Sequence, residues 1–83
     1  MEKNDIFVLV SKEIRKHIGS DRSIEMINNI QEIGLNSIDF IKLLIFIEDK
    51  FEFEFNDDEL ELENYVTIED VINAIHSKLY SVK

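Results

Sequence analysis

Apolar side chains recur at helical intervals in three segments of the chain. The first segment covers residues 4–18 and has one apolar stripe with spacings of three and four, formed by Phe7, Val10, Ile14 and Ile18. This spacing predicts an amphipathic helix. Gly19 follows the last apolar residue and is placed to cap the end of that helix.

The clearest helix signal lies near the end of the chain. Thr67 is a suitable N-cap, and Asp70 stands three residues later, in a variant of the capping box. The stripe that follows has helical spacing and consists of Ile68, Val71, Ile72, Ile75 and Leu79.

The middle segment, residues 37–50, is apolar around most of its circumference. One face contains Ile38, Ile41 and Ile45, and the other faces contain Phe40, Leu43, Leu44 and Ile47. A chain of 83 residues cannot surround a helix on all sides. The second face is therefore either a surface for a protein partner or the edge of a wide core stripe.

The connections between these helices are less regular. Residues 20–36 form a long loop with scattered apolar residues, which should pack its own side chains or serve a function. Residues 51–55 alternate Phe and Glu, as strands do, but a lone strand has nothing to pair with. We interpret this stretch as a helix end and an extended connection with Phe51 and Phe55 inward. Asn56 or Asp57 would then cap a short helical turn over residues 58–62.

Together these patterns predict an all-α fold, a small bundle of three main helices and one short one, in a single domain covering residues 1–83. The chain has no cysteine, so it has neither disulfides nor a thiolate metal site. It shows no secretory signal and no segment long enough to span a bilayer. We therefore expect a cytoplasmic protein.

Charge is distributed unevenly along the chain. The net charge is −9; residues 1–36 carry five bases and six acids, and residues 37–83 carry four bases and twelve acids. Repulsion from phosphates argues against nucleic-acid partners and anionic membranes. Basic protein surfaces would be attracted, although acidity also serves solubility alone.

Few residues could perform chemistry by themselves. The acids of residues 57–63 lack the glycine of a calcium-binding loop, so they are predicted to form a solvated face. His17 and His76 stand apart and are predicted to be surface or helix-end residues, with no metal site. Ser37 lacks both a nucleophile elbow and an evident base, so we predict no catalytic residues.

The most informative segment is Gly34-Leu35-Asn36-Ser37-Ile38-Asp39. It places a serine hydroxyl at the start of the apolar helix, just after a glycine that can turn the backbone. One interpretation is a plain helix cap, because Asn and Ser both satisfy free backbone amides. A second is an attachment point, because helix N-termini also stabilise phosphate groups. The two interpretations are compatible.

This segment and its surroundings resemble the acyl and peptidyl carrier protein family. The family signature is a glycine, an apolar residue, Asp, Ser and Leu or Ile, then a helix that ends in acids and phenylalanine. The chain shows this order in Gly34 to Phe40, in Ile47-Glu48-Asp49-Lys50-Phe51, in the acidic string of residues 54–60 and in the cap at Thr67. With the first helix and long loop, the resemblance covers nearly the whole chain.

The resemblance implies a carrier without catalytic activity. Ser37 would be esterified by 4'-phosphopantetheine, supplied from coenzyme A by a phosphopantetheinyl transferase. The thiol of this arm would hold acyl or aminoacyl groups loaded by an activating ligase, for delivery by a monomeric carrier to downstream synthase or transferase enzymes. The implied partner surface consists of Ile38, Asp39, Ile41, Ile45, Glu48 and Asp49.

Several positions depart from the family pattern. Asn36 replaces the usual aspartate before the serine, and Lys42 stands where many fatty-acid carriers have glutamate. Asn56 replaces a common proline, and Phe46 and Phe53 are bulkier than usual. These departures favour a carrier for polyketide, nonribosomal peptide or other specialised biosynthesis. The alternatives are a housekeeping fatty-acid carrier and an interaction module that kept the fold without the cofactor.

Overall fold

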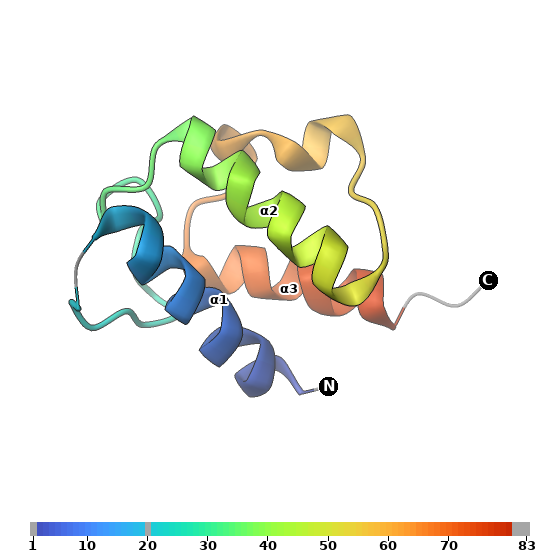
Figure 1. Cartoon of the computed structure of the whole chain (residues 1–83), viewed down its shortest axis with the longest axis horizontal. Helices are drawn as coiled ribbons and strands as arrows, with labels where there is room; N and C mark the ends of the chain where they lie inside the picture. Colours follow the sequence, from blue (N-terminus) through green and yellow to red (C-terminus); the bar gives the residue numbers. More distant parts are fainter. Residues whose placement is uncertain (1, 20, 81–83) are drawn as a thin grey trace.

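The computed structural model describes residues 2–19 and 21–80, and it confirms the predicted all-α fold. Helix α1 covers Lys3–Ile18, α2 covers Ser37–Phe51 and α3 covers Ile68–Leu79. Two short 3₁₀ turns, η1 (Asp57–Leu60) and η2 (Leu62–Asn64), lie between α2 and α3 (Figure 1). Within the described ranges, the one β-type pairing is an isolated bridge between Asn29 and Thr67.

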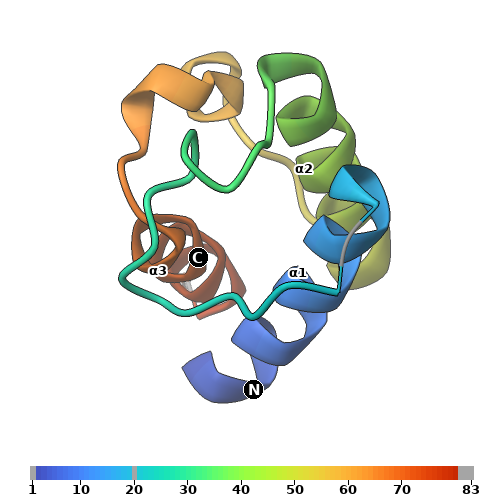
Figure 2. The ribbon, with the colours of Figure 1, turned by 90° about the vertical axis from the view of Figure 1, so that its left-hand side faces the viewer.

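The core lies between the three helices, and α1 packs on both α2 and α3 (Figure 2). Each helix contributes fully or almost fully buried side chains: Ile6, Val10 and Ile14 from α1; Phe40, Leu43, Leu44 and Ile47 from α2; Ile68, Val71, Ile72 and Ile75 from α3. Within the described part of the chain, no helix is both long and apolar enough to cross a membrane.

The stripe predicted for α1 was wrong at its start. Ile6 is fully buried, whereas Phe7 is only half-buried, and the helix begins at Lys3, one residue earlier than expected. Ser11 also turns inward, where its hydroxyl donates to the Val8 carbonyl at 3.2 Å. The inner face is therefore wider than the predicted stripe: Ile6 joins Val10 and Ile14 at its centre, and Phe7 and Ile18 pack against the core from its edge.

The cap signals at the helix ends are confirmed. Gly19 adopts the left-handed conformation, with φ 65°, and its N–H donates to the Arg15 carbonyl at 3.0 Å. At α3, the Thr67 hydroxyl accepts a hydrogen bond from the Asp70 N–H, and the Asp70 carboxylate accepts one from the Thr67 N–H. These local contacts fix where α1 ends and α3 begins.

The long loop packs its own side chains against the core, as expected. Its buried residues are Ile24, Ile30, Ile33 and Leu35. Its backbone is also tied to the start of α3: the Ile30 N–H donates to the Val66 carbonyl at 2.9 Å, and the Ile68 N–H donates to the Asn28 carbonyl at 3.0 Å. The loop is therefore held at both its side chains and its backbone.

Helix α2 ends one residue later than predicted, at Phe51, and the cause is an unusual C-cap. Glu52 has φ 61°, a left-handed conformation that favours glycine. The turn lets the next two aromatic rings pack together. Phe51 and Phe53 stack with centroids 6.4 Å apart, and Phe53 meets Phe55 edge-on at 5.1 Å. Phe55 is buried as predicted, whereas Phe51 is only half-buried.

Residues 52–66 form a return segment that runs back along α2 toward its N-terminus (Figure 1). The helical turn predicted for residues 58–62 is instead the pair η1 and η2, so its predicted bounds were wrong. Asn56 is the N-cap of η1, and its N–H donates to the Glu59 carboxylate at 2.6 Å.

The Glu59 carboxylate also pins the return segment to α3, because it lies 2.9 Å from Lys78 Nζ. Partial burial raises the pKa of Glu59, but the hydrogen bonds from Lys78 and the Asn56 N–H, with the charge of Lys78, outweigh it and lower the pKa below 4.5. The folded state thus favours the ionised carboxylate of Glu59.

We predict that Glu59→Gln lowers the free energy of unfolding at neutral pH but not in acid. A lowered folded-state pKa gives stability that is present above the unfolded pKa and lost as pH falls through the folded one. Urea unfolding across pH 3 to 7 measures this, with exposed Glu54→Gln as the control. A difference from the parent chain that stays constant over the whole range would contradict the prediction.

Candidate functional site

Ser37 is the first residue of α2, and its side chain is exposed. The cap in front of it is Asn36, whose Oδ1 accepts a hydrogen bond from the Asp39 N–H at 2.7 Å. The Asn36 carbonyl accepts the Phe40 N–H at 2.9 Å. Within the described residues, the Ser37 hydroxyl has no hydrogen-bond partner. Asn36 therefore performs the capping role and leaves the serine oxygen available.

The backbone before Ser37 is fixed by a turn at Gly34. Its φ of 97° requires glycine, and its N–H donates to the Gln31 carbonyl at 3.3 Å. The next residue, Leu35, is buried and anchors the turn in the core. The backbone of Ser37 thus has a defined position, set by a buried residue on one side and a capped helix on the other.

A surface pocket of about 400 Å³ opens beside Ser37. Ser37 and Ile41 form its α2 side. The return segment contributes the opposite side through Leu60, Glu61, Leu62 and Glu63. Gln31 from the long loop completes the lining. The pocket is mixed in character, because Leu60 and Leu62 are half-buried and the two carboxylates are exposed.

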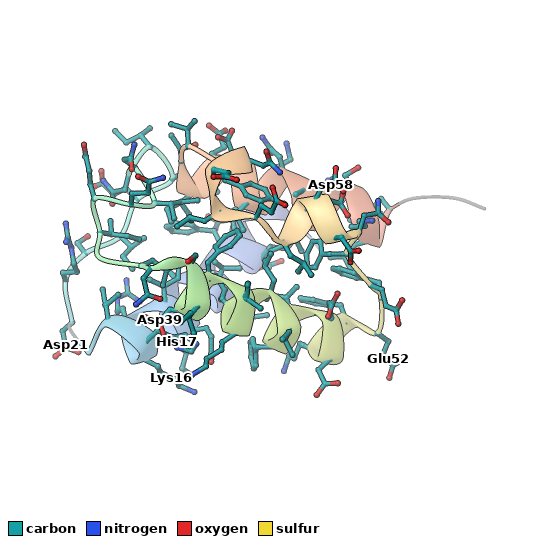
Figure 3. All side chains as sticks on the ribbon, turned by 90° about the horizontal axis from the view of Figure 1, so that it is seen from above. Lys16, His17, Asp21, Asp39, Glu52 and Asp58 are labelled. Carbon is teal, nitrogen blue, oxygen red and sulfur yellow. The ribbon has the colours of Figure 1, made fainter. Side chains whose placement is uncertain are left out.

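Asp39 lies near the start of α2 but points toward α1 (Figure 3). His17 lies between two carboxylates: its Nδ1 is 3.8 Å from Asp39 Oδ1 and its Nε2 is 3.7 Å from Glu13 Oε2. His17 thus links the end of α1 to the first turn of α2. Negative charge at the start of a helix also interacts favourably with the helix dipole.

The outer face of α2 consists of Ile38, Ile41, Lys42, Ile45 and Asp49, all of them exposed. The exposed fractions of the three isoleucines are 66%, 39% and 53%. These three aliphatic side chains, spaced three and four residues apart, form an exposed apolar strip along one side of α2. Phe40, Leu43, Leu44 and Ile47 fill the opposite, buried face.

The structure does not bring all the predicted partner residues onto this face. Glu48 is half-buried, and its Oε2 accepts a hydrogen bond from the Phe55 N–H at 2.7 Å. Asp39 is half-buried against His17. Ile38, Ile41, Ile45 and Asp49 are the predicted residues that share the outer face.

Two parts of the site were not predicted. The pocket wall from residues 60–63 lies far from Ser37 in sequence, Gln31 lies six residues before it, and no local motif marks either of them. The contact between His17 and Asp39 joins two separate helices, so no local pattern predicts it. The one feature of the sequence that pointed to a role for His17 was its position in the last turn of α1.

The arrangement suits a serine that receives a group from another protein. No described residue hydrogen bonds to its hydroxyl. The N–H groups of Ser37 and Ile38 lie in the first turn, where the helix offers no acceptors, and they face a phosphate favourably. Within the described residues, no group of three or more His, Asp or Glu side chains could hold a metal ion.

Comparison with known proteins gives a consistent result. A family model described as "Phosphopantetheine attachment site" matches residues 8–75. The acyl carrier protein of Exiguobacterium sibiricum is 30% identical over 81 residues, covering 95% of this chain and all of that protein. The acyl carrier protein of Campylobacter lari is 31% identical over 74 residues, covering 87% of this chain and 94% of its own length.

The acyl carrier protein of Coprothermobacter proteolyticus is 35% identical over 52 residues, covering 63% of this chain and 61% of that protein. Among solved structures, the acyl carrier protein of Thermotoga maritima superposes with a TM-score of 0.83 at 26% identity, covering all of this chain and 96% of that one.

Proposed function

The chain belongs to the phosphopantetheine attachment site family, and we propose that Ser37 is the residue that carries its 4'-phosphopantetheine arm. Members of this family are carriers and not catalysts, so the arm supplies the chemistry: its terminal thiol holds the cargo as a thioester. The single observation that supports Ser37 is its exposed hydroxyl, free of hydrogen bonds within the described residues, at the first position of a helix that Asn36 already caps.

The residues around Ser37 fit the attached group. The first-turn N–H groups and the helix dipole favour a phosphodiester at this oxygen. The pocket beside it is lined by apolar and polar side chains, as an arm with amide groups and methylenes requires. In the attachment step, Ser37 Oγ bonds to the phosphorus that bears pantetheine, a pyrophosphate P–O bond of coenzyme A breaks, adenosine 3',5'-bisphosphate leaves, and the transferase takes the serine proton.

We predict that a broad-specificity phosphopantetheinyl transferase and coenzyme A add one arm to the chain and none to Ser37→Ala. Mass measurement of the intact protein shows the gain. Ser23→Ala, which removes another exposed hydroxyl, is the matched control and should load fully. An equal gain in Ser37→Ala would reject Ser37. A parent chain that stays unmodified, also after isolation from its native host, would favour a cofactor-free interaction module.

We further propose that partner enzymes dock on the outer face of α2, next to Ser37. Its three isoleucines offer apolar contact, and the acidic second half of the chain steers basic surfaces toward it over long distances. The partners are the phosphopantetheinyl transferase, an acyl- or amino-acid-activating ligase and downstream synthases. Such encounters are brief, so fast association matters more than buried area.

Ile45→Asp should lower the kcat/KM of arm transfer about tenfold, because it places a charge in the centre of the contact, at a cost of about 1.4 kcal/mol. The exposed position of Ile45 leaves the fold intact. Val8→Asp on α1 adds the same charge to a side chain that is also exposed and should leave the rate unchanged. Equal rates for the two variants would place the docking surface elsewhere.

We propose that the carrier serves polyketide, nonribosomal peptide or other specialised biosynthesis. Lys42 supports this, since it puts a positive charge on an otherwise apolar and acidic face, and a change of charge there alters which partners are accepted. Asn36 also differs from the family pattern, because it replaces the usual aspartate before Ser37 and so removes a negative charge there. Mass analysis of the thioester on chain isolated from its native host tests the proposal. A ladder of saturated chains growing by two carbons would instead identify a housekeeping fatty-acid carrier.

A further inference from the structure

Two aromatic rings fill the space between α2 and the return segment. Phe40 follows Ser37 by one helical turn and is fully buried, and Tyr65, just after η2, is 8% exposed. Their ring centroids lie 5.2 Å apart, with the ring planes tilted by 55°. This is a favourable packing geometry for an aromatic pair.

Tyr65 is held in place at its hydroxyl and at its backbone. The hydroxyl donates to the Glu59 carbonyl at 2.8 Å, and the backbone N–H donates to the Leu62 carbonyl at 3.1 Å. Burial raises the pKa of Tyr65 to about 12, helped by the charges of Glu59 and Asp58. The hydroxyl therefore stays protonated and keeps its hydrogen bond at physiological pH. Moving the ring would leave a polar group unpaired.

Apart from Gln31 in the long loop, the residues that line the pocket beside Ser37 belong to the same two elements that hold this pair. Ile41, which lines the pocket, is next to Phe40 on α2. Leu62, which also lines it, accepts the hydrogen bond from the Tyr65 N–H through its carbonyl. At about 400 Å³ the pocket is near the lower end of ligand sites, roughly 300 to 1,000 Å³. It must also accommodate part of the arm. The remaining room suits a short cargo at the surface, near Glu61 and Glu63.

Resting on the proposed function, we infer that Phe40 and Tyr65 close the bundle to its cargo, so that the chain carries a short acyl group at the surface pocket and does not bury a long alkyl chain between its helices. Entry of an alkyl chain would require both rings to move within a tightly packed core, and overpacked cores are strained. Three further side chains of α2 are buried in the same core as the pair: Leu43, Leu44 and Ile47.

The test compares melting temperatures of the chain loaded from butyryl-, octanoyl- and dodecanoyl-coenzyme A by a broad-specificity transferase. An alkyl chain that enters the core removes more apolar surface from water as it lengthens, so the melting temperature rises with length. We expect the three loaded forms of the parent chain to have the same melting temperature. The rate of thioester cleavage by hydroxylamine should also be the same for all three, because the cargo stays exposed.

Phe40→Ala opens a cavity one turn from Ser37, and its loaded forms should melt at higher temperatures as the acyl chain lengthens. Phe55→Ala is the matched control: Phe55 is also a buried phenylalanine, but its backbone contacts Glu48, about 16 Å along α2 from Ser37. It should destabilise the chain without any dependence on cargo length. If Phe40→Ala does not fold, Phe40→Leu opens a smaller cavity for the same comparison.

A parent chain whose melting temperature climbs with acyl length, or whose long thioesters resist hydroxylamine, would overturn the inference. If the melting temperatures of both Phe40 variants do not depend on acyl length, the inference that Phe40 closes the bundle is overturned. Failure of Ser37 to load with unacylated coenzyme A is a different result, since it rejects the proposed function, and the inference falls with it.

Discussion

The rotation of α2 about its own axis is the constraint on which the site depends. Successive residues of a helix are about 100° apart, so burying Phe40, Leu43, Leu44 and Ile47 on one side fixes every other side chain of the helix. Ile38 and Ile45 are then forced outward. Ser37 and Ile41, four residues apart, fall together on the edge that faces the return segment. The packing of the buried face of α2 thus determines which way Ser37 faces on the helix.

The return segment provides the other half of the site, and tertiary contacts hold it there. It contains two short 3₁₀ turns, which have little stability of their own. Its position is fixed by three contacts. Glu59 forms an ion pair with Lys78 on α3, and the Tyr65 ring packs against Phe40. The Phe55 N–H donates a hydrogen bond to the Glu48 carboxylate. These contacts are spread along its length, and together they hold the pocket wall opposite Ser37.

The parts of the fold that could be predicted from sequence are those that local chemistry decides. Gly19, Thr67 and Asp70 satisfy backbone groups within their own turn, so their patterns were sufficient. The cap of α2 shows the limit: both Asn36 and Ser37 are good cap residues, and only the backbone conformation assigns the role to Asn36. Glu52 could not be predicted, because a glutamate, unlike a glycine, gives no sequence signal for the left-handed conformation that ends α2.

The charge distribution fits the proposed docking of several partner enzymes on the outer face of α2. A face made only of isoleucines would bind apolar surfaces indiscriminately, and a purely acidic face would attract any basic protein. The outer face combines an apolar strip with Lys42 near its middle and Asp49 at its far end. A partner that docks on this face as proposed would have to match both charges in that order, because an unmatched charge costs desolvation without compensation. In the proposed docking, steering by the acidic half of the chain brings partners close, and the two charges on α2 select among them.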